Sequence, residues 1–247
     1  FKVMFNGDTY VSSSLYLGGT KITSTAAELN LLDGATSLGT GILSPVIEGS
    51  NTGVRLSTAV AANHGDIGSN AVDLSYSDAT STTYGATGDS STAMGESTTA
   101  SGFNSTAMGW YTTARGFFST AMGESTTASG FVSTAIGRFT TASGTQSTAM
   151  GDNTTASGFA STAMGRSTTA SGESSTAMGQ STTASDYGSL VIGQFNSSGS
   201  SATSASSATT FNTANTAFVI GNGTSATASD AFKVMFNGDT TIGNDLT

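Results

Sequence analysis

The chain has 247 residues, a formal net charge of −9, no cysteine, and only 9% charged residues. Alanine is prominent among its 36% of hydrophobic residues, and such a composition does not build a conventional globular core. The absence of cysteine excludes disulfides. The acidic balance argues against nucleic acid or an anionic membrane as a partner, because phosphate contacts require Lys and Arg. No run of about 20 apolar residues occurs, so we expect no membrane span in this segment.

Residues 1–19 are predicted to form a β-hairpin that acts as a connector. Asn6 and Gly7 lie between two alternating runs, which is the strongest short-range hairpin signal. Residues 1–9 recur, residue for residue, at 232–240. This identity has two interpretations: a 231-residue superperiod of a tandem fibre, or a local module that is used twice.

Residues 20–87 are predicted to form one short helix followed by irregular β coils. Thr25 and Glu28 have the spacing of a capping box and Gly34 is a stop signal, so the helix is expected near residues 26–32. Pro45 argues against a centrally paired position for its own residue. His64, the only histidine, is flanked by Asn63 and Gly65 and is expected to be a turn residue.

Residues 88–195 form the regular part of the sequence. From Gly88 the unit G-x-x-S-T-A-M-G-x-x-T-T-A-S repeats every 14 residues, with seven full copies and a worn eighth that begins at Asp186. Threonine favours strands, whereas a glycine every seven residues would damage a helix and suits a chain that must turn. Each repeat is therefore predicted to be two short strands and two tight corners, stacked as a parallel β-solenoid.

Side-chain alternation predicts which residues face into the coil. Alanine recurs on both strands, and two facing alanine ladders fill a thin coil. One larger apolar residue per coil then points outward: Met94, Met108, Met122, Ile136, Met150, Met164, Met178 and Ile192. A continuous exposed apolar ladder requires a partner, and a further copy of the same chain is the simplest one.

Residues 196–217 are almost entirely Ser, Thr, Ala and Asn and are predicted to be a connection along the surface. Residues 218–247 return to strand and corner, and they repeat the N-terminal module. Flanking segments, including T-A-A-E-L-N-L-L-D-G at residues 25–34, resemble phage tail-fibre proteins.

The repeat S-T-A-M-G-x-x-T-T-A-S-G resembles the S-V-A-I-G-x-x-A-x-A-x-G head repeat of trimeric autotransporter adhesins, the YadA-type β-roll. The resemblance covers residues 88–193 and departs from the family in placing Thr for Val and Met for Ile. It implies an all-β, left-handed parallel β-roll assembled as an intertwined homotrimeric fibre, with the methionine ladder near the threefold axis as the trimer interface. The alternative is a monomeric solenoid with methionines inside and alanines outside.

Large aromatic side chains occupy variable corner positions, where side chains normally face water. They form a candidate attachment surface for a glycan or protein receptor, because rigid rings bind at little entropic cost. The alternative is that they plug grooves between neighbouring rolls of the trimer. The positions are Phe103, Trp110, Tyr111, Phe117, Phe118, Phe131, Phe139 and Phe159.

Catalysis is not supported by the sequence. With one histidine and no cysteine, it offers no nucleophile–base–orienter set, and no cofactor motif occurs. Corner residues such as Asp89, Asp152 and Asn153 lack the nonapeptide pattern of calcium β-rolls, so no metal site is expected.

The function expected from these features is that of a non-enzymatic, trimeric, extracellular fibre segment that mediates attachment to a surface or host. A phage tail fibre is the main alternative, which leaves both a cell surface and a virion as locations. A purely structural spacer is a further alternative. So is an ice-binding solenoid, because Thr99 and Ser101 recur in every coil as an outward T-x-S array interrupted by aromatic and charged corners.

Overall fold

The computed structural model describes residues 42–197 and 207–243, together with the backbone of four short strands closer to the N-terminus. The chain divides into two units, Phe1–Ile42 and Leu43–Thr247, which are described separately. In the first unit, β1 (Lys2–Val3) pairs antiparallel with β2 (Thr9–Tyr10), the pairing expected on either side of the predicted turn, and Asn6 and Gly7 themselves lie outside the described residues. A second pair joins β3 (Tyr16–Leu17) and β4 (Thr20–Lys21). The helix predicted near residues 26–32 lies outside the described residues.

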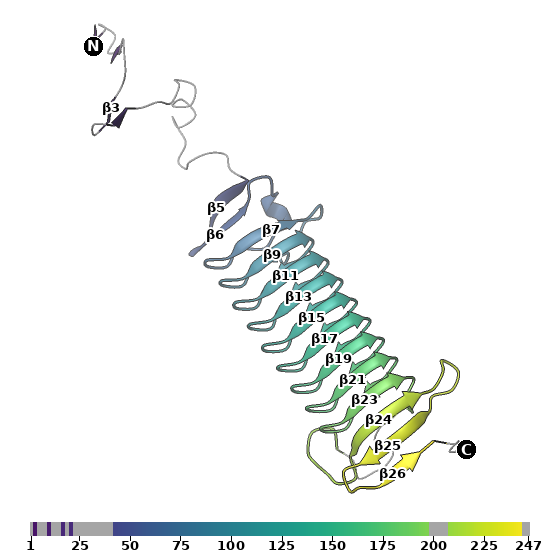
Figure 1. Ribbon diagram of the computed structural model, residues 1–247. Coiled ribbons are helices and arrows are strands. Elements are labelled where there is room, and N and C mark those ends of the chain that lie inside the picture. Colours follow the sequence, from purple (N-terminus) through teal and green to yellow (C-terminus); the bar gives the residue numbers. More distant parts are fainter. Residues whose placement is uncertain are drawn as a thin grey trace. The chain divides into compact units, whose positions relative to one another are not determined.

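The second unit is a β-solenoid whose long strands stack along the chain (Figure 1). From β7 to β22, each coil has a long strand, a corner, a short strand and a second corner. Neighbouring coils pair in parallel without slippage: Ala107 pairs with Ala93 on one side and with Ala121 on the other. The long strands are β7 (Val72–Tyr76), β9 (Thr92–Glu96), β11 (Thr106–Trp110), β13 (Thr120–Glu124), β15 (Thr134–Arg138), β17 (Thr148–Asp152), β19 (Thr162–Arg166), β21 (Thr176–Gln180), β23 (Leu190–Gln194) and β24 (Thr216–Asn222). The short strands are β8 (Gly85–Ala86), β10 (Thr99–Ala100), β12 (Thr113–Ala114), β14 (Thr127–Ala128), β16 (Thr141–Ala142), β18 (Thr155–Ala156), β20 (Thr169–Ala170) and β22 (Thr183–Ala184).

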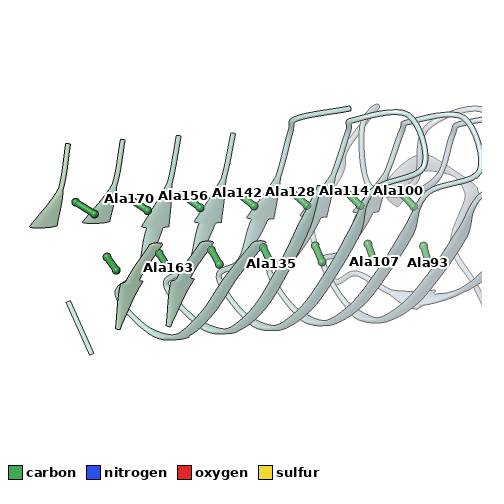
Figure 2. Packing of buried hydrophobic residues seen from close by; sticks show 14 of the residues in the cluster. Ala93, Ala100, Ala107, Ala114, Ala128, Ala135, Ala142, Ala156, Ala163 and Ala170 are labelled. Atoms are coloured by element: carbon green, nitrogen blue, oxygen red, sulfur yellow. The ribbon is translucent and has the colours of Figure 1, made fainter. Parts of the chain in front are cut away.

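The interior of the solenoid is built from small side chains, as the alternation predicted. Alanines of the long strands, such as Ala93, and of the short strands, such as Ala100, are fully buried and form two facing rows (Figure 2). In the regular coils, a buried serine precedes the long strand, as Ser105 does, and a buried threonine precedes the short strand, as Thr112 does. The solenoid with methionines inside and alanines outside is therefore excluded.

Two kinds of glycine allow the coils to stack at strand spacing. Gly123 has φ 121°, and a Cβ there would lie closer than 3.0 Å to the backbone of Gly137 in the next coil. Gly130 does not have positive φ, but its own Cβ would collide with the carbonyl of Gly144 in the same way. The first kind is thus required by conformation and space, and the second by space alone.

The N-terminal end of the solenoid is closed by a hairpin rather than by a coil. Strand β5 (Leu43–Glu48) pairs antiparallel with β6 (Asn51–Leu56), and β6 pairs in parallel with β7. Pro45 lies in β5, the edge strand of the sheet, where proline is tolerated. A 3-10 turn, η1 (Ala61–Asn63), is the only helical element among the described residues. Coil stacking therefore begins at β7, before the expected start of the regular array at residue 88.

The C-terminal end continues the long-strand sheet. Strand β24 pairs in parallel with β23, and β25 (Asp230–Met235) and β26 (Thr240–Ile242) then pair antiparallel as a hairpin. In this hairpin Lys233 lies opposite Thr241 and Val234 opposite Thr240. The N-terminal hairpin has the same register, with Lys2 opposite Tyr10 and Val3 opposite Thr9. Of the predicted connection at 196–217, residues 198–206 lie outside the described residues.

Candidate functional site: an apolar ladder and two aromatic corners

The predicted methionine and isoleucine ladder lies on the outer face of the long-strand sheet. Met108 pairs in register with Met94 and Met122, and Met122 pairs with Ile136. The ladder side chains are half-buried, apart from Met150 and Met178, which are 37% and 38% exposed. No side chain of the described residues covers the ladder completely, so it remains available to a partner.

The ladder is longer than the sequence repeat suggests. Leu74 of β7 pairs with Met94, and Ile220 of β24 pairs with Ile192. Both extra side chains are half-buried like the methionines, and they extend the apolar face at its two ends. Sequence reasoning missed them because neither residue belongs to a regular copy of the repeat, although their alternating strands V-D-L-S-Y and A-F-V-I-G carried the signal.

The first aromatic corner follows the glycine that precedes each buried serine. Phe103 lies 5.6 Å from Phe118 and 6.1 Å from Phe117, measured between ring centroids. Phe118 lies 5.8 Å from Phe131, and both of these pairs with Phe118 are edge-to-face. All four rings are 40–56% exposed, and Phe159 farther along the corner is 48% exposed. The structure thus joins four of the predicted rings into one cluster, and Phe159 has no ring contact with it.

The second aromatic corner lies on the other edge of the solenoid. Trp110 and Tyr111 are each 45% exposed, and their rings are 4.8 Å apart. Tyr111 also contacts Tyr84 edge-to-face at 6.5 Å. Phe139 is 48% exposed, and the guanidinium carbon of Arg138 lies 5.1 Å from its ring centre. The predicted aromatic residues therefore form two separate surfaces, one at each of the two corners that they occupy in the repeat.

The second variable residue of the regular corners adopts the left-handed region, although only the one at Gly188 is glycine. Phe118 has φ 58°, Tyr111 has φ 52° and the β-branched Val132 has φ 55°. Such φ values are unfavourable for these residue types, so the corner geometry is imposed by the stacked coils. The sequence pattern indicated turns at the glycines but gave no signal for the left-handed region at these positions.

The outer face of the short-strand sheet carries the expected T-x-S array. Thr99 is half-buried and Ser101 is exposed, and from β10 to β22 the pair recurs in each coil with Thr as the first residue and, with one exception, Ser as the second. The exception is Arg115, which occupies the position of Ser101 one coil later.

A buried polar cluster near the N-terminal end was not predicted. Asp73 Oδ2 accepts a hydrogen bond from Arg55 Nε at 3.0 Å and lies 3.1 Å from Nδ1 of His64. Arg55 also pairs with Glu48 at 3.0 Å and donates to the carbonyl of Gly65. His64 directly follows η1 in a bend, as expected of a turn residue, but its side chain is buried in this cluster. The signal in the sequence was one charged residue at an inward-facing position of each strand, Arg55 in β6 and Asp73 in β7.

The pKa of the Asp73 carboxyl reflects two opposing effects. Burial of the carboxyl acts to raise the pKa, but the contact with His64 and the hydrogen bonds from Ser75 outweigh it. The net result is a pKa below the usual value. The cluster holds β6, β7 and the loop at His64 together through a carboxylate that is charged at neutral pH.

The part of the chain that the structure describes contains neither a cluster of metal-binding side chains nor a membrane-spanning helix. No group of three His, Asp or Glu side chains there is arranged to hold a metal ion. No helix in that part is long and apolar enough to cross a membrane.

Geometry and sequence together define a class: a parallel β-roll of 14-residue coils with an alanine interior and an outward apolar ladder. The family model of the YadA head domain repeat (2 copies) matches residues 86–112, 133–154, 156–181 and 170–196. The solenoid therefore carries YadA-type head repeats, as the resemblance of the repeat implied. No curated protein matches the sequence.

Proposed function

We propose that this chain is a non-enzymatic segment of a homotrimeric, extracellular fibre that attaches to a surface or host. The observation that carries the proposal is the apolar ladder on a roll whose alanines already fill its interior. The YadA-type repeats support it, because such head domains are those of trimeric surface adhesins.

The ladder supplies the energy of assembly in this proposal. Burying one methionine side chain contributes about 1.5–3 kcal/mol. The eight predicted ladder residues, extended by Leu74 and Ile220, follow the stack of coils. A threefold axis along this face lets each coil contact its two symmetry mates, and the contact is repeated from coil to coil. In this way, weak contacts that are repeated in many coils add up to a stable fibre.

Attachment is assigned to the aromatic corners. The cluster of Phe103, Phe117, Phe118 and Phe131 and the pair of Trp110 and Tyr111 are exposed in the single chain. They lie at the edges of the roll, whereas the ladder lies on its long-strand face. A glycan or protein receptor is the partner class that such rigid, exposed rings suit.

A phage tail fibre is the second candidate, favoured by the sequence T-A-A-E-L-N-L-L-D-G at residues 25–34. The two candidates share the trimeric β-roll and differ in what the fibre is anchored to. Antibodies raised against residues 88–195 would distinguish them. Labelling of the cell envelope supports the adhesin, and labelling of virions supports the tail fibre.

The mass of the purified chain in solution tests the assembly. One chain has a mass of 24.4 kDa, so a trimer has about three times that mass. Sedimentation equilibrium is expected to give the trimer mass at micromolar concentration. A folded species of 24.4 kDa, with the circular dichroism of a β-solenoid, would contradict the proposal.

A further inference from the structure

A cleft of about 450 Å³ opens on the outer face of the short-strand sheet near its N-terminal end. Its floor includes Thr99 and Thr113, and Thr82 and Tyr84 come from the corner between β7 and β8. Arg115 completes the lining. The volume is within the range of small-ligand sites, and the lining is rich in hydroxyl groups.

The cleft exists because one corner of the solenoid is expanded. Tyr76 pairs with Glu96 and Gly85 with Thr99, so the two coils have the same register before and after the corner. Between these paired positions the first coil has eight residues, 77–84, whereas the next has two, 97 and 98. Long insertions in an otherwise regular scaffold are places where binding sites occur.

The expanded corner is fixed by hydrogen bonds rather than left open. Ser81 N donates to the carbonyl of Ala62 at 3.1 Å, and Asn63 Nδ2 donates to the carbonyl of Ser77 at 2.6 Å. Gly65 N donates to the carbonyl of Tyr84 at 2.9 Å. Because η1 and the corner hold each other, the cleft is preformed, and little ordering is required when a ligand binds.

Arg115 gives the cleft its charge. The equivalent outward position is serine in the other regular coils and Thr87 in the first coil. Arg115 is exposed, and no carboxylate among the described residues forms an ion pair with it. In a chain with a net charge of −9, an unpaired guanidinium beside a hydroxyl-lined cleft is a local site for an anion.

Aromatic rings stand beside the same cleft. Tyr84 lines it and contacts Tyr111, and Tyr111 contacts Trp110. Aromatic rings provide flat apolar faces, and the threonines provide hydroxyl donors and acceptors. The aromatic rings suit the apolar face of a sugar ring, the threonine hydroxyls suit its hydroxyl groups, and the guanidinium suits a carboxylate on the sugar.

We propose that this cleft binds a carboxylated sugar unit of a glycan, with Arg115 bound to its carboxylate and the threonine hydroxyls bound to its ring hydroxyls. This inference deepens the proposed attachment function and rests on it for its biological role. All of the cleft residues come from one chain, so the binding itself does not require the trimer.

The test is saturation-transfer NMR and calorimetry on the full chain with sialyllactose and a glucuronate disaccharide, and with lactose as the uncharged comparison. Arg115→Ser restores the residue of the repeat and is expected to fold normally. It should weaken binding of the acidic sugars at least about tenfold. Arg166→Ser removes the same charge from a remote corner and should leave binding unchanged. Tyr111→Ser, which also introduces a residue used by other coils, should weaken binding as well.

Each outcome decides the proposal. Binding of the acidic sugars that depends on Arg115 but not on Arg166 supports it. The absence of binding, equal binding of lactose, or equal loss in both arginine variants overturns it. Sedimentation of the same samples separates the two proposals. A trimer that does not bind the sugars overturns only the proposed sugar site, and a monomer that binds them overturns only the proposed trimer.

Discussion

Met108 and Met122 occupy paired positions on the neighbouring parallel strands β11 and β13, on the face opposite the buried Ala107 and Ala121. This relationship is repeated along the solenoid and gives the two faces of the long-strand sheet different roles. The alanines close each coil, and the methionines are left for contact with another chain.

Ala135→Leu tests the alanine interior. Ala135 is fully buried in the row that faces the alanines of the short strands, as Figure 2 shows, so the larger side chain has no space. We expect overpacking to cost about 1–3 kcal/mol or more, measured as a lower melting temperature by circular dichroism. Ser143→Leu adds the same side chain at an exposed position of the same coil and serves as the control. Equal melting of the two variants would contradict the assignment of faces.

Gly123→Ala tests the combined need for positive φ and for space. Gly123 has φ 121° and no room for a Cβ, whereas Gly238 has φ 91° and open space around it. Backbone strain costs about 1–3 kcal/mol, and both variants are subject to it. The collision adds a further cost only at Gly123. Gly123→Ala should therefore melt well below Gly238→Ala, and the opposite order would refute the close stacking at this glycine.

The regular coils could be predicted because every copy has the same 14-residue period and the same inward–outward alternation of side chains. The position of each alanine and methionine follows from the 14-residue repeat and strand pleating. Arg55, His64 and Asp73 come together only through the pairing of β6 with β7 and the folding of the loop at His64, and no local pattern records such contacts. The left-handed corners at Phe118 and Val132 were missed for a different reason, since local propensity argues against them and the stacked coils impose them.

Asp73→Asn tests the buried polar cluster. Loss of the charge from a fully buried partner of Arg55 should cost about 3 kcal/mol or more at neutral pH. The Asp73 pKa is lowered in the folded state, so its contribution is complete above the unfolded value of about 4 and is lost as the pH falls below it. The unfolding free energy of the variant should therefore fall less steeply than that of the parent as the pH is lowered through the acid range.

Asp152→Asn is the matched control for that experiment. Asp152 pairs with Arg138 at 3.0 Å, but the two side chains are 37% and 52% exposed. An exposed pair contributes about 0–1 kcal/mol, so this variant should melt close to the parent. If the two substitutions destabilise the protein equally, Asp73 does not hold the N-terminal end together.

Phe118→Asn tests the role of the phenylalanine corner. Asparagine is the residue at the same position one coil earlier, Asn104, and it tolerates the left-handed region. If the corner is an attachment surface, the variant should keep its mass and its unfolding free energy within about 0.5 kcal/mol. Its fluorescence enhancement of an anilinonaphthalene sulfonate probe should fall. A large loss of trimer stability would instead assign the rings to grooves between chains.

The ladder is tested by replacing Met122 and Met150 together with aspartate. At a threefold axis this change places three carboxylates in each of two layers with little water, which costs several kcal/mol or raises their pKa. Ser125→Asp with Asn153→Asp adds the same charge on corners of the same coils, at positions whose φ values of 51° and 55° aspartate tolerates.

Sedimentation equilibrium of this Met122→Asp, Met150→Asp chain at pH 7 and at pH 4 tests the central claim most directly. The expected result is loss of the trimer at pH 7 with partial recovery at pH 4, where protonation removes the repulsion, while the corner variant stays trimeric at both pH values. A ladder variant that remains trimeric at pH 7, with the melting temperature of the parent, would show that the methionines do not hold the chains together.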